Sequence, residues 1–505
     1  MALTLAALRA GGDAFMEDVS REQYRAHAGL QRGADLQAVY ARHAAVLGRD
    51  ALELTLGLYQ ESAEGTEERR AARMLLEWQA ESQAGRVVAR EEEREIAWES
   101  SAVVHVGDGR AIPYAAVGIT IADATDRRER QALDDARAAL VARELAPIRR
   151  DRLARERSFI ESLDVAPSYN AAFEALSGIS LGGLAAECRA LLERTAPLWD
   201  DVQPRELRRR LGVKKGEATR ADAMALFRAR EFDDAFPGGA LESSIRRQAG
   251  EMGLDVTAGG RVILDTGERE GKRARAFCAP VRVPDEVYLV LRPHGGQQDY
   301  ATFLHELGHA LHFAHMRPDL PFESRWVGDN SVTEGYAMLF DHLTAKRAWL
   351  LRYTGLTRER VDAYLRSGAF EELHMLRRYA SKLLYEIELY GNAVPFDSLP
   401  DLYVETLGAG TGFRYQRADA FVDVDPRFYS TRYLRAWQLQ GVLDDALTER
   451  FDADWYRNPS AGPWMVGELF GEGQRELATE LSERVAGQGL SFEPLARGLE
   501  RAFGG

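Results

Sequence analysis

The chain is poor in cysteine. Its 505 residues include only two, Cys188 and Cys278, which stand far apart in the sequence. So few thiols exclude a small fold stapled by disulfides, and they are typical of proteins kept in a reducing compartment. We therefore expect two buried thiols that do not pair with each other, and a cytoplasmic location.

Long apolar runs and an excess of positive charge are also missing. No stretch approaches the ~20 apolar residues that span a bilayer. The opening MALTLAALRAGG has no basic leader and only a short apolar run, so no signal peptide is expected. The net charge of −14 disfavours nucleic acid and anionic membranes as partners, because both attract basic surfaces. The oligomeric state stays unknown.

Helical periodicity covers most of the chain, which predicts a mostly α fold. Two stretches differ. VVHVGDGRAIPYAAVGITIA (103–122) alternates around Gly107-Asp108-Gly109 and predicts a β-hairpin, and residues 253–293 contain the apolar runs AFCAPV and EVYLVL, which predict a small β-sheet. We expect an N-terminal helical region over 1–250 and a catalytic region over 251–505, with a soft boundary between them.

Histidine is scarce, yet four of the ten histidines fall in DYATFLHELGHALHFAH. Asp299 is the expected N-cap of this helix, and Arg317-Pro318 ends it. His305 and His309 lie one turn apart on one helix face, where two imidazoles can hold one Zn²⁺. Glu306 projects about 100° away from His305. It therefore flanks the ion, where a general base for the attacking water must stand.

A catalytic zinc needs a third protein ligand from another element. Glu334, in SVTEGYAMLFDHL, is 25 positions beyond His309 and would complete a His₂Glu site. Asp341 lies two turns further on and could orient a ligand imidazole, but we do not count it among the site residues. The alternative for HELGH is a chance match, with both histidines satisfied in the core. His312 and His315 are expected to pack rather than bind the ion.

HELGHALH followed by TEGYAM resembles the thimet oligopeptidase and oligoendopeptidase F family of zinc metallopeptidases. REGKRARAFCAPV and DEVYLVLRP resemble that family's turn and two strands. The resemblance covers about residues 170–450 and is strong over 270–340. It implies one zinc per chain, short peptides as substrates, and two helical halves that enclose a deep channel, with a small β-sheet beside the active-site helix. The strand AFCAPV would pair with the peptide main chain.

Late in the chain, DVDPRFYSTRYLRAWQLQ (423–440) stands where the family carries a His and Tyr-rich segment. The family His is missing, and either Arg427 or Asp423 stands in its place. Arg432-Tyr433 resembles the Arg-Tyr pair of the related converting enzymes. The resemblance therefore implies Tyr433 as the oxyanion donor, with Tyr429 as second choice.

Two further functions compete with an oligoendopeptidase. A carboxypeptidase or dipeptidyl-carboxypeptidase on the same scaffold would need a cation to hold the substrate's terminal carboxylate, and Arg292, Arg427 and Arg432 are the candidates. An inactive, zinc-bearing peptide-binding protein is the third reading. Glu306 argues against it, because a binding site does not need a proton acceptor beside the ion.

Overall fold

The computed structural model describes residues 3–107, 109–228, 230–273 and 275–504. These residues are mostly α-helical, as the periodicity predicts, and they contain two small sheets. They divide into two compact units. Unit 1 is formed by Met1–Ala80, Arg230–Arg366 and Arg435–Arg497, and unit 2 by Glu81–Ala229, Ser367–Leu434 and Gly498–Gly505. Residue 250, where the sequence predicts a soft boundary, lies inside unit 1.

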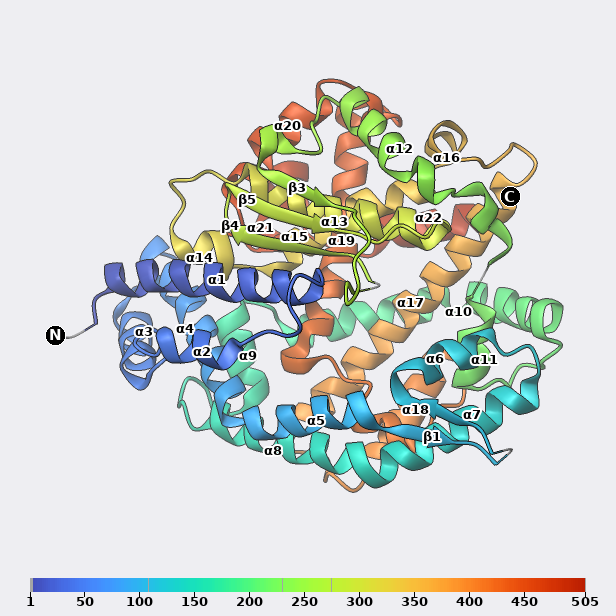
Figure 1. The fold of residues 1–505 in the computed structure, drawn as a ribbon, viewed down its shortest axis with the longest axis horizontal. Helices are drawn as coiled ribbons and strands as arrows, with labels where there is room; N and C mark the ends of the chain where they lie inside the picture. Colours follow the sequence, from blue (N-terminus) through green and yellow to red (C-terminus); the bar gives the residue numbers. More distant parts are fainter. Residues whose placement is uncertain (1–2, 108, 229, 274, 505) are drawn as a thin grey trace. The chain divides into compact units, whose positions relative to one another are not determined.

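Unit 1 holds the HELGH segment, the three-stranded sheet and ten of the helices in the described part of the chain, several of which are labelled in Figure 1. Its α-helices are α1 (Leu5–His27), α2 (Leu36–Arg42), α3 (Arg49–Glu61), α12 (Gly238–Glu251), α13 (Gln297–His315), α14 (Phe322–Trp326), α15 (Asn330–Asp341), α16 (Arg347–Tyr353), α20 (Ala461–Glu468) and α21 (Ala478–Ala486). Its 3₁₀ turns are η3 (Arg230–Ala235), η4 (Ala258–Gly260), η5 (His342–Ala345), η8 (Trp455–Arg457) and η9 (Phe470–Glu472).

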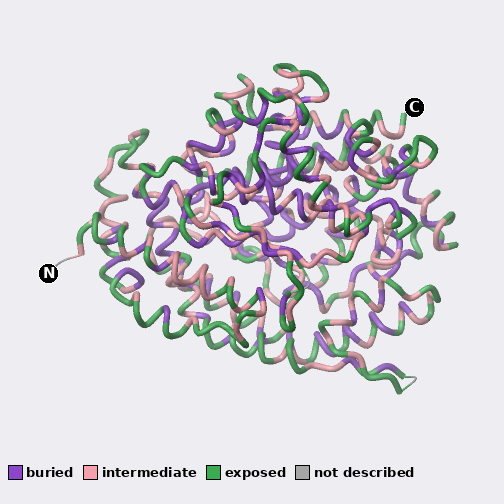
Figure 2. The backbone as a smooth tube through the Cα atoms, turned by 45° about the horizontal axis from the view of Figure 1, so that its top comes forward, coloured by how far each residue is buried: buried purple, intermediate pink, exposed green. Residues whose placement is uncertain are grey.

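Four long helices contain residues of both units: α4 (Glu67–Val87), α17 (Val361–Tyr390), α19 (Tyr429–Phe451) and α22 (Glu493–Phe503). Buried positions alternate with exposed ones along the helices, which Figure 2 shows as purple and green stretches of the same tube. This pattern is what an amphipathic helix with one face in the core produces.

The predicted sheet in unit 1 is confirmed. It consists of β3 (Val262–Asp265), β4 (Phe277–Arg282) and β5 (Glu286–Val290), in the order β3-β5-β4. β3 runs parallel to β5, whereas β4 is antiparallel to it. Helix α13 packs against β4 and β5, and α1 lies alongside β4 (Figure 1). The main core of unit 1 forms between this sheet, α13 and α15, and it includes Leu289, Leu307 and Leu339.

Helix α13 begins two residues earlier than the expected N-cap. Its N-cap is Gly296, and Asp299 lies inside the first turn. There the Asp299 carboxylate accepts the backbone N–H groups of His294 and Gly295, at 2.6 and 2.7 Å. Gly295 and Gly296 have φ of 90° and 97°, a left-handed backbone that favours glycine. The acidic residue therefore holds the glycine turn that leads into the helix.

Unit 2 contains the remaining elements. Its α-helices are α5 (Ala89–Ser101), α6 (Tyr114–Asp123), α7 (Arg127–Leu140), α8 (Ala146–Glu161), α9 (Tyr169–Ser177), α10 (Leu181–Glu206), α11 (Arg220–Leu226) and α18 (Leu399–Thr411). Two π turns, η1 (Val141–Leu145) and η2 (Leu207–Leu211), extend α7 and α10, and the 3₁₀ turns are η6 (Arg417–Phe421) and η7 (Pro426–Phe428).

The hairpin expected over 103–122 is only half present. β1 (Val103–His105) pairs antiparallel with β2 (Ala111–Pro113), and Asp108 of the expected turn lies outside the described residues. From Tyr114 onward the chain is helical. Val117 and Ile121 stand one turn apart and are both buried, so α6 places one face in a small core of unit 2. Packing of that face outweighs the strand preference of the β-branched residues.

Among the residues described, no single helix is long and apolar enough to cross a membrane. One bent pair of helical segments, Tyr169–Ser177 with Leu181–Leu211, passes that test of length and composition when the two are taken together.

Candidate metal centre

The two helices that carry the predicted metal ligands cross at very close range. A Cβ atom on Gly308 of α13 would stand 2.6 Å from Cα of Ala337 and 2.8 Å from the carbonyl oxygen of Tyr336, both on α15. Any side chain at residue 308 would push the two backbones apart. The glycine of HELGH therefore lets α15 come near enough to present Glu334 to the two histidines.

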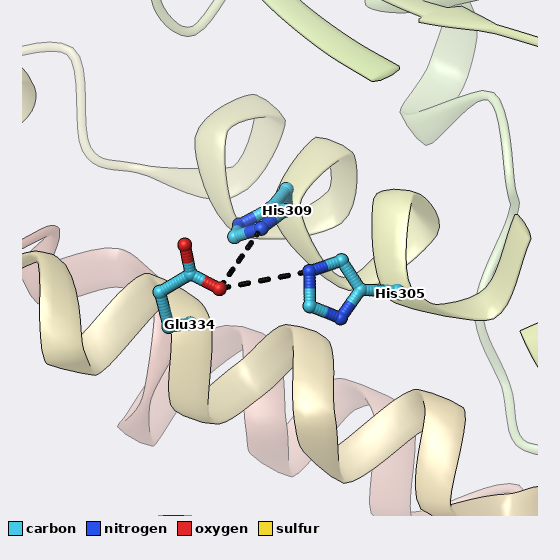
Figure 3. A group of neighbouring side chains, drawn as sticks. All are labelled: His305, His309 and Glu334. Atoms are coloured by element: carbon cyan, nitrogen blue, oxygen red, sulfur yellow. Dashed lines mark ion pairs between the residues drawn. The ribbon is translucent and has the colours of Figure 1, made fainter. Parts of the chain in front are cut away.

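His305, His309 and Glu334 converge at this crossing (Figure 3). Glu334 Oε2 lies 3.6 Å from His305 Nε2 and 3.7 Å from His309 Nε2. Atoms that each bind one tetrahedral zinc at about 2.0–2.2 Å stand roughly 3.3–3.6 Å from one another. The spacing is thus too long for hydrogen bonds but close to that of a metal site. Two imidazoles and one carboxylate are also a donor set that suits zinc, so the residues fit the ion that the sequence predicts.

The second nitrogen of each imidazole has a partner on α15. His305 Nδ1 lies 2.9 Å from Asp341 Oδ2, and His309 Nδ1 lies 2.9 Å from Thr333 Oγ1. With its proton on Nδ1, His305 donates to the carboxylate and turns the lone pair of Nε2 toward Glu334. Partners of this kind set the tautomer and the ring orientation of metal-binding histidines. Asp341 therefore occupies the orienting position that the sequence only suggested, and Thr333 was not foreseen.

The two imidazoles of the centre differ in how tightly they bind a proton. Burial lowers the pKa of His305, but the hydrogen bond to Asp341 and the negative charges of Asp341, Glu334 and Glu306 outweigh burial and raise it to about 9. Burial and the charge of His305 hold the pKa of His309 well below its usual range. The imidazole of His305 thus binds a proton more tightly than that of His309. A cation bound here would compete with that proton, because only a deprotonated nitrogen can be a metal ligand.

Glu306 is buried beside this centre and is tied to the sheet. Its Oε2 accepts the backbone N–H of Cys278, on β4, at 2.8 Å. Burial raises the pKa of Glu306, as a general base requires. Burial and the charge of Glu306 also raise the pKa of the Cys278 thiol, which therefore stays protonated. Cys188 and Cys278 form no disulfide, as expected. Cys278 lies on the strand that the sequence predicts to pair with a peptide main chain. Its N–H is not available for that pairing, because it donates to Glu306.

The other two histidines of the helix have structural partners. His312 is fully buried, stacks on Phe313, and its Nε2 lies 3.2 Å from the carbonyl oxygen of Gly473. His315 Nδ1 lies 2.8 Å from the carbonyl oxygen of Leu311, within its own helix. Both residues pack, as the sequence predicts.

Tyr429 and Tyr433 lie at the start of α19, within unit 2. Both side chains are partly exposed, and their rings meet edge to face with centroids 5.0 Å apart. Tyr433 also contacts Tyr379, at 5.7 Å between centroids. The structure groups these hydroxyl-bearing rings, and their role as oxyanion donors stays a prediction.

Arg427, one of the candidates for a carboxylate clamp, has partners of its own. Its Nε donates to Oε1 of the buried Glu156 at 3.0 Å, and its backbone N–H donates to the Tyr390 hydroxyl at 3.1 Å. The side chain is nevertheless partly exposed. Asp423, the other residue in place of the family histidine, accepts from the Tyr403 hydroxyl at 2.8 Å and pairs with Arg378. The choice among Arg292, Arg427 and Arg432 as clamp stays a prediction.

Comparison with known proteins gives a fold but no family. No protein-family model matches the chain, and no curated protein matches it either. Similar solved structures include a protein described as BsuCP (16% identity, TM-score 0.61, covering 98% of this chain and 97% of the other). A carboxypeptidase from Pyrococcus furiosus (12%, 0.63, 99% and 99%) and an M32 carboxypeptidase from Deinococcus radiodurans R1 (15%, 0.62, 98% and 97%) are also similar.

At such identities the similarity establishes the fold alone, over almost the whole length of the chain. The mostly α architecture expected from the sequence is therefore shared with these structures. Two of the three are described as carboxypeptidases. The oligoendopeptidase F assignment made from the motifs is not confirmed by them.

Proposed function

We propose that this protein is a zinc-dependent peptidase that hydrolyses short peptides, with His305, His309 and Glu334 as the metal ligands. The observation that carries the proposal is that Glu334 Oε2 lies 3.6 Å from His305 Nε2 and 3.7 Å from His309 Nε2. Glu306 lies alongside these three residues. Such a set leaves one coordination position open, which is the mark of a catalytic rather than a structural zinc site. A cytoplasmic location fits the scarcity of cysteine.

The bound ion would supply a Lewis acid that polarises the scissile carbonyl and lowers the pKa of a water molecule. Glu306 would take the proton from that water and pass it to the leaving amine, a role usually worth about 10²–10⁴ in rate. Asp341 and Thr333 would hold the two imidazoles in the orientation that keeps Nε2 free. In this proposal the hydroxyl of Tyr433, or else that of Tyr429, donates to the tetrahedral oxyanion, which is typically worth roughly 3–4 kcal/mol.

Two cleavage modes fit the same centre, and different observations favour each. Similarity in fold to chains described as carboxypeptidases favours removal of residues from the C-terminus. The motif pair HELGHALH and TEGYAM favours internal cleavage, by its resemblance to the oligoendopeptidases. We give preference to the carboxypeptidase mode, because the similarity in fold extends over nearly the whole chain.

A product map separates the modes. Zinc-loaded protein is incubated with a mixture of peptides, each present with a free and with an amidated C-terminus, and the products are identified by mass spectrometry. A carboxypeptidase shortens only the free forms, by one residue at a time or by two if it is a dipeptidyl-carboxypeptidase. An oligoendopeptidase cuts both forms internally. Complete lack of zinc-dependent turnover would leave only the peptide-binding role and would end the proposal.

A further inference from the structure

The contact between β4 and Glu306 engages one of the two oxygens of the proposed proton acceptor. Glu306 Oε2 accepts the Cys278 N–H at 2.8 Å. Among the described residues, no hydrogen bond reaches the other oxygen, Oε1. One carboxylate oxygen is thus anchored, and the other is left to accept a proton. A carboxylate tethered by one oxygen can turn only about that tether, so its second oxygen explores far fewer directions.

The donor is available because of the position of β4 in the sheet. β4 is at the end of the order β3-β5-β4, and among the strands of the described residues it pairs with β5 alone. Successive N–H groups of a strand point to opposite sides, so every second one on β4 turns away from β5 and needs another partner. The Cys278 N–H is such a group. Pro280, two positions on and directed to the same side, has no N–H to offer.

The donor is also held rigidly. Leu289 stands opposite Cys278 in the register and is fully buried in the core. The loop that leads into β4 is secured by Lys272, whose ammonium group is buried. Lys272 Nζ donates to the carbonyl oxygens of Asp265, Gly267 and Leu291, at 2.7, 2.8 and 2.9 Å. These bonds join the loop to the ends of β3 and β5. These contacts therefore hold the N–H of Cys278 in the position from which it donates to Glu306.

We infer that the backbone N–H of Cys278 positions Glu306 for catalysis, by anchoring Oε2 so that Oε1 faces the attacking water. The thiol takes no part, and the group that matters is a main-chain amide supplied by the sheet. This inference rests on the proposed peptidase function, because it assigns the residue that aims the general base.

The test replaces one atom. An ester at residue 278, made by incorporating lactic acid in place of cysteine, removes the N–H and keeps the strand geometry. Its matched control is Cys278→Ala, which has the same side chain and keeps the N–H. Both zinc-loaded proteins are compared by metal content, circular dichroism, kcat and KM. Because the ester lacks a hydrogen bond to a charged group, we expect its kcat to fall on the order of tenfold to a hundredfold below that of Cys278→Ala, with KM and zinc content unchanged.

Equal kcat in the ester and in Cys278→Ala would overturn the inference. So would an ester protein that loses its zinc, because the contact would then be structural. If the ester protein does not fold, Cys278→Pro removes the same N–H on a strand that already accommodates Pro280, and the same criteria apply to it. A parent protein and a Cys278→Ala variant that both hold zinc but cleave no peptide would instead refute the proposed function itself.

Discussion

Asp341 lies between two imidazoles. Its Oδ2 is 2.9 Å from His305 Nδ1, and its Oδ1 is 2.6 Å from His342 Nδ1. The same His342 nitrogen lies 2.7 Å from the carbonyl oxygen of Met338, so it must carry a proton and donate. The carboxylate is thus held in its orientation toward His305 by a neighbour from its own chain segment.

Asp341→Asn should weaken zinc binding. An amide can donate to His305 Nδ1 and so favour the tautomer with its proton on Nε2, which blocks the ligand position. Loss of such partners typically costs about 10–100-fold in metal affinity, and titration with a competing chelator measures the change. Asp319→Asn, which removes the same charge at an exposed site of unit 1, is the control. Equal affinities in the two variants would show that Asp341 does not orient the ligand.

Glu306→Gln should retain zinc and lose most of the peptidase rate. Glutamine is nearly isosteric and can still accept the Cys278 N–H, but it cannot accept a proton at neutral pH. We expect kcat to fall by about 10²–10⁴ or more, with zinc content unchanged by metal analysis. Near-parent turnover in this variant would move the role of base to another group.

The sequence predicts the ligands better than their partners, for a physical reason. The i, i+4 spacing of His305 and His309 is a property of one helix, so it can be inferred locally. Thr333 reaches the site because of the angle at which α15 crosses α13. Cys278 reaches it because of the register of β4 in the sheet. Neither quantity is encoded in a short stretch of sequence. The same limit explains why the oxyanion donor stays a choice between two tyrosines.

At the scale of elements, the approach of α13 to α15 depends on one missing side chain. Gly308→Ala should push Glu334 away from the histidines, because the added methyl group would stand 2.6 Å from the backbone of α15. Overpacking of this kind typically costs about 1–3 kcal/mol of stability. We expect weaker zinc binding and a lower melting temperature. Gly250→Ala, in α12 where no atom stands within 4 Å, is the control and should not destabilise. Unchanged zinc affinity in Gly308→Ala would contradict the crossing argument.

The turn that starts α19 is strained and held from several sides. Arg427 and Phe428 both have φ of 54°, an uncommon conformation for residues other than glycine. The buried Glu386 spans the turn, since it accepts the Asp425 N–H at 2.8 Å and also the Ser430 hydroxyl. Strained segments persist only where their surroundings determine them, and they are common at functional sites. This turn sets the direction in which the two candidate tyrosines leave it.

Glu386 should make unit 2 less stable as the pH rises. Burial raises its pKa to about 8, with help from the charge of Asp425 and against that of Lys382. Between about pH 4.5 and 8 the unfolded chain loses this proton while the folded chain keeps it, so the stabilisation present at low pH is lost. The melting temperature, measured at pH 5, 6.5 and 8, should fall less steeply with pH in Glu386→Gln than in the parent. Glu405→Gln, at an exposed site, should follow the parent. Identical slopes in all three proteins would refute the assignment.

One element was predicted with the wrong type, and its neighbours explain why. The stretch YAAVGITIAD is rich in β-branched residues, yet it forms α6. Its buried residues pack with Val104 and Leu133, which come from other elements of unit 2. A preference of about 1 kcal/mol or less per residue is easily overridden by such burial. The strands around the metal helix were predicted correctly, because turn residues and apolar runs mark both of their ends.

At the scale of the whole molecule, zinc should act on stability through unit 1, since all three proposed ligands belong to it. A free zinc concentration of about 100 times Kd adds ~2.7 kcal/mol to the folded state. Scanning calorimetry with zinc and with a chelator should therefore show a transition that rises by several degrees. His309→Ala should lose this response. The metal assignment would be contradicted if zinc did not raise the transition temperature of the parent protein, or if it raised that of His309→Ala by the same amount.

The order in which the segments of unit 1 are synthesised constrains when the centre can mature. The ligand helices lie in the middle segment, whereas Leu439, Trp455 and Phe470, which complete the core around them, belong to Arg435–Arg497. Leu439 packs directly on Gly335, next to the proposed ligand Glu334. A ribosome must therefore translate the segment Arg435–Arg497 before this core can close. Until then the nascent chain carries a helix pair without its apolar cover, and exposed apolar surface of this kind makes incompletely folded chains prone to aggregate.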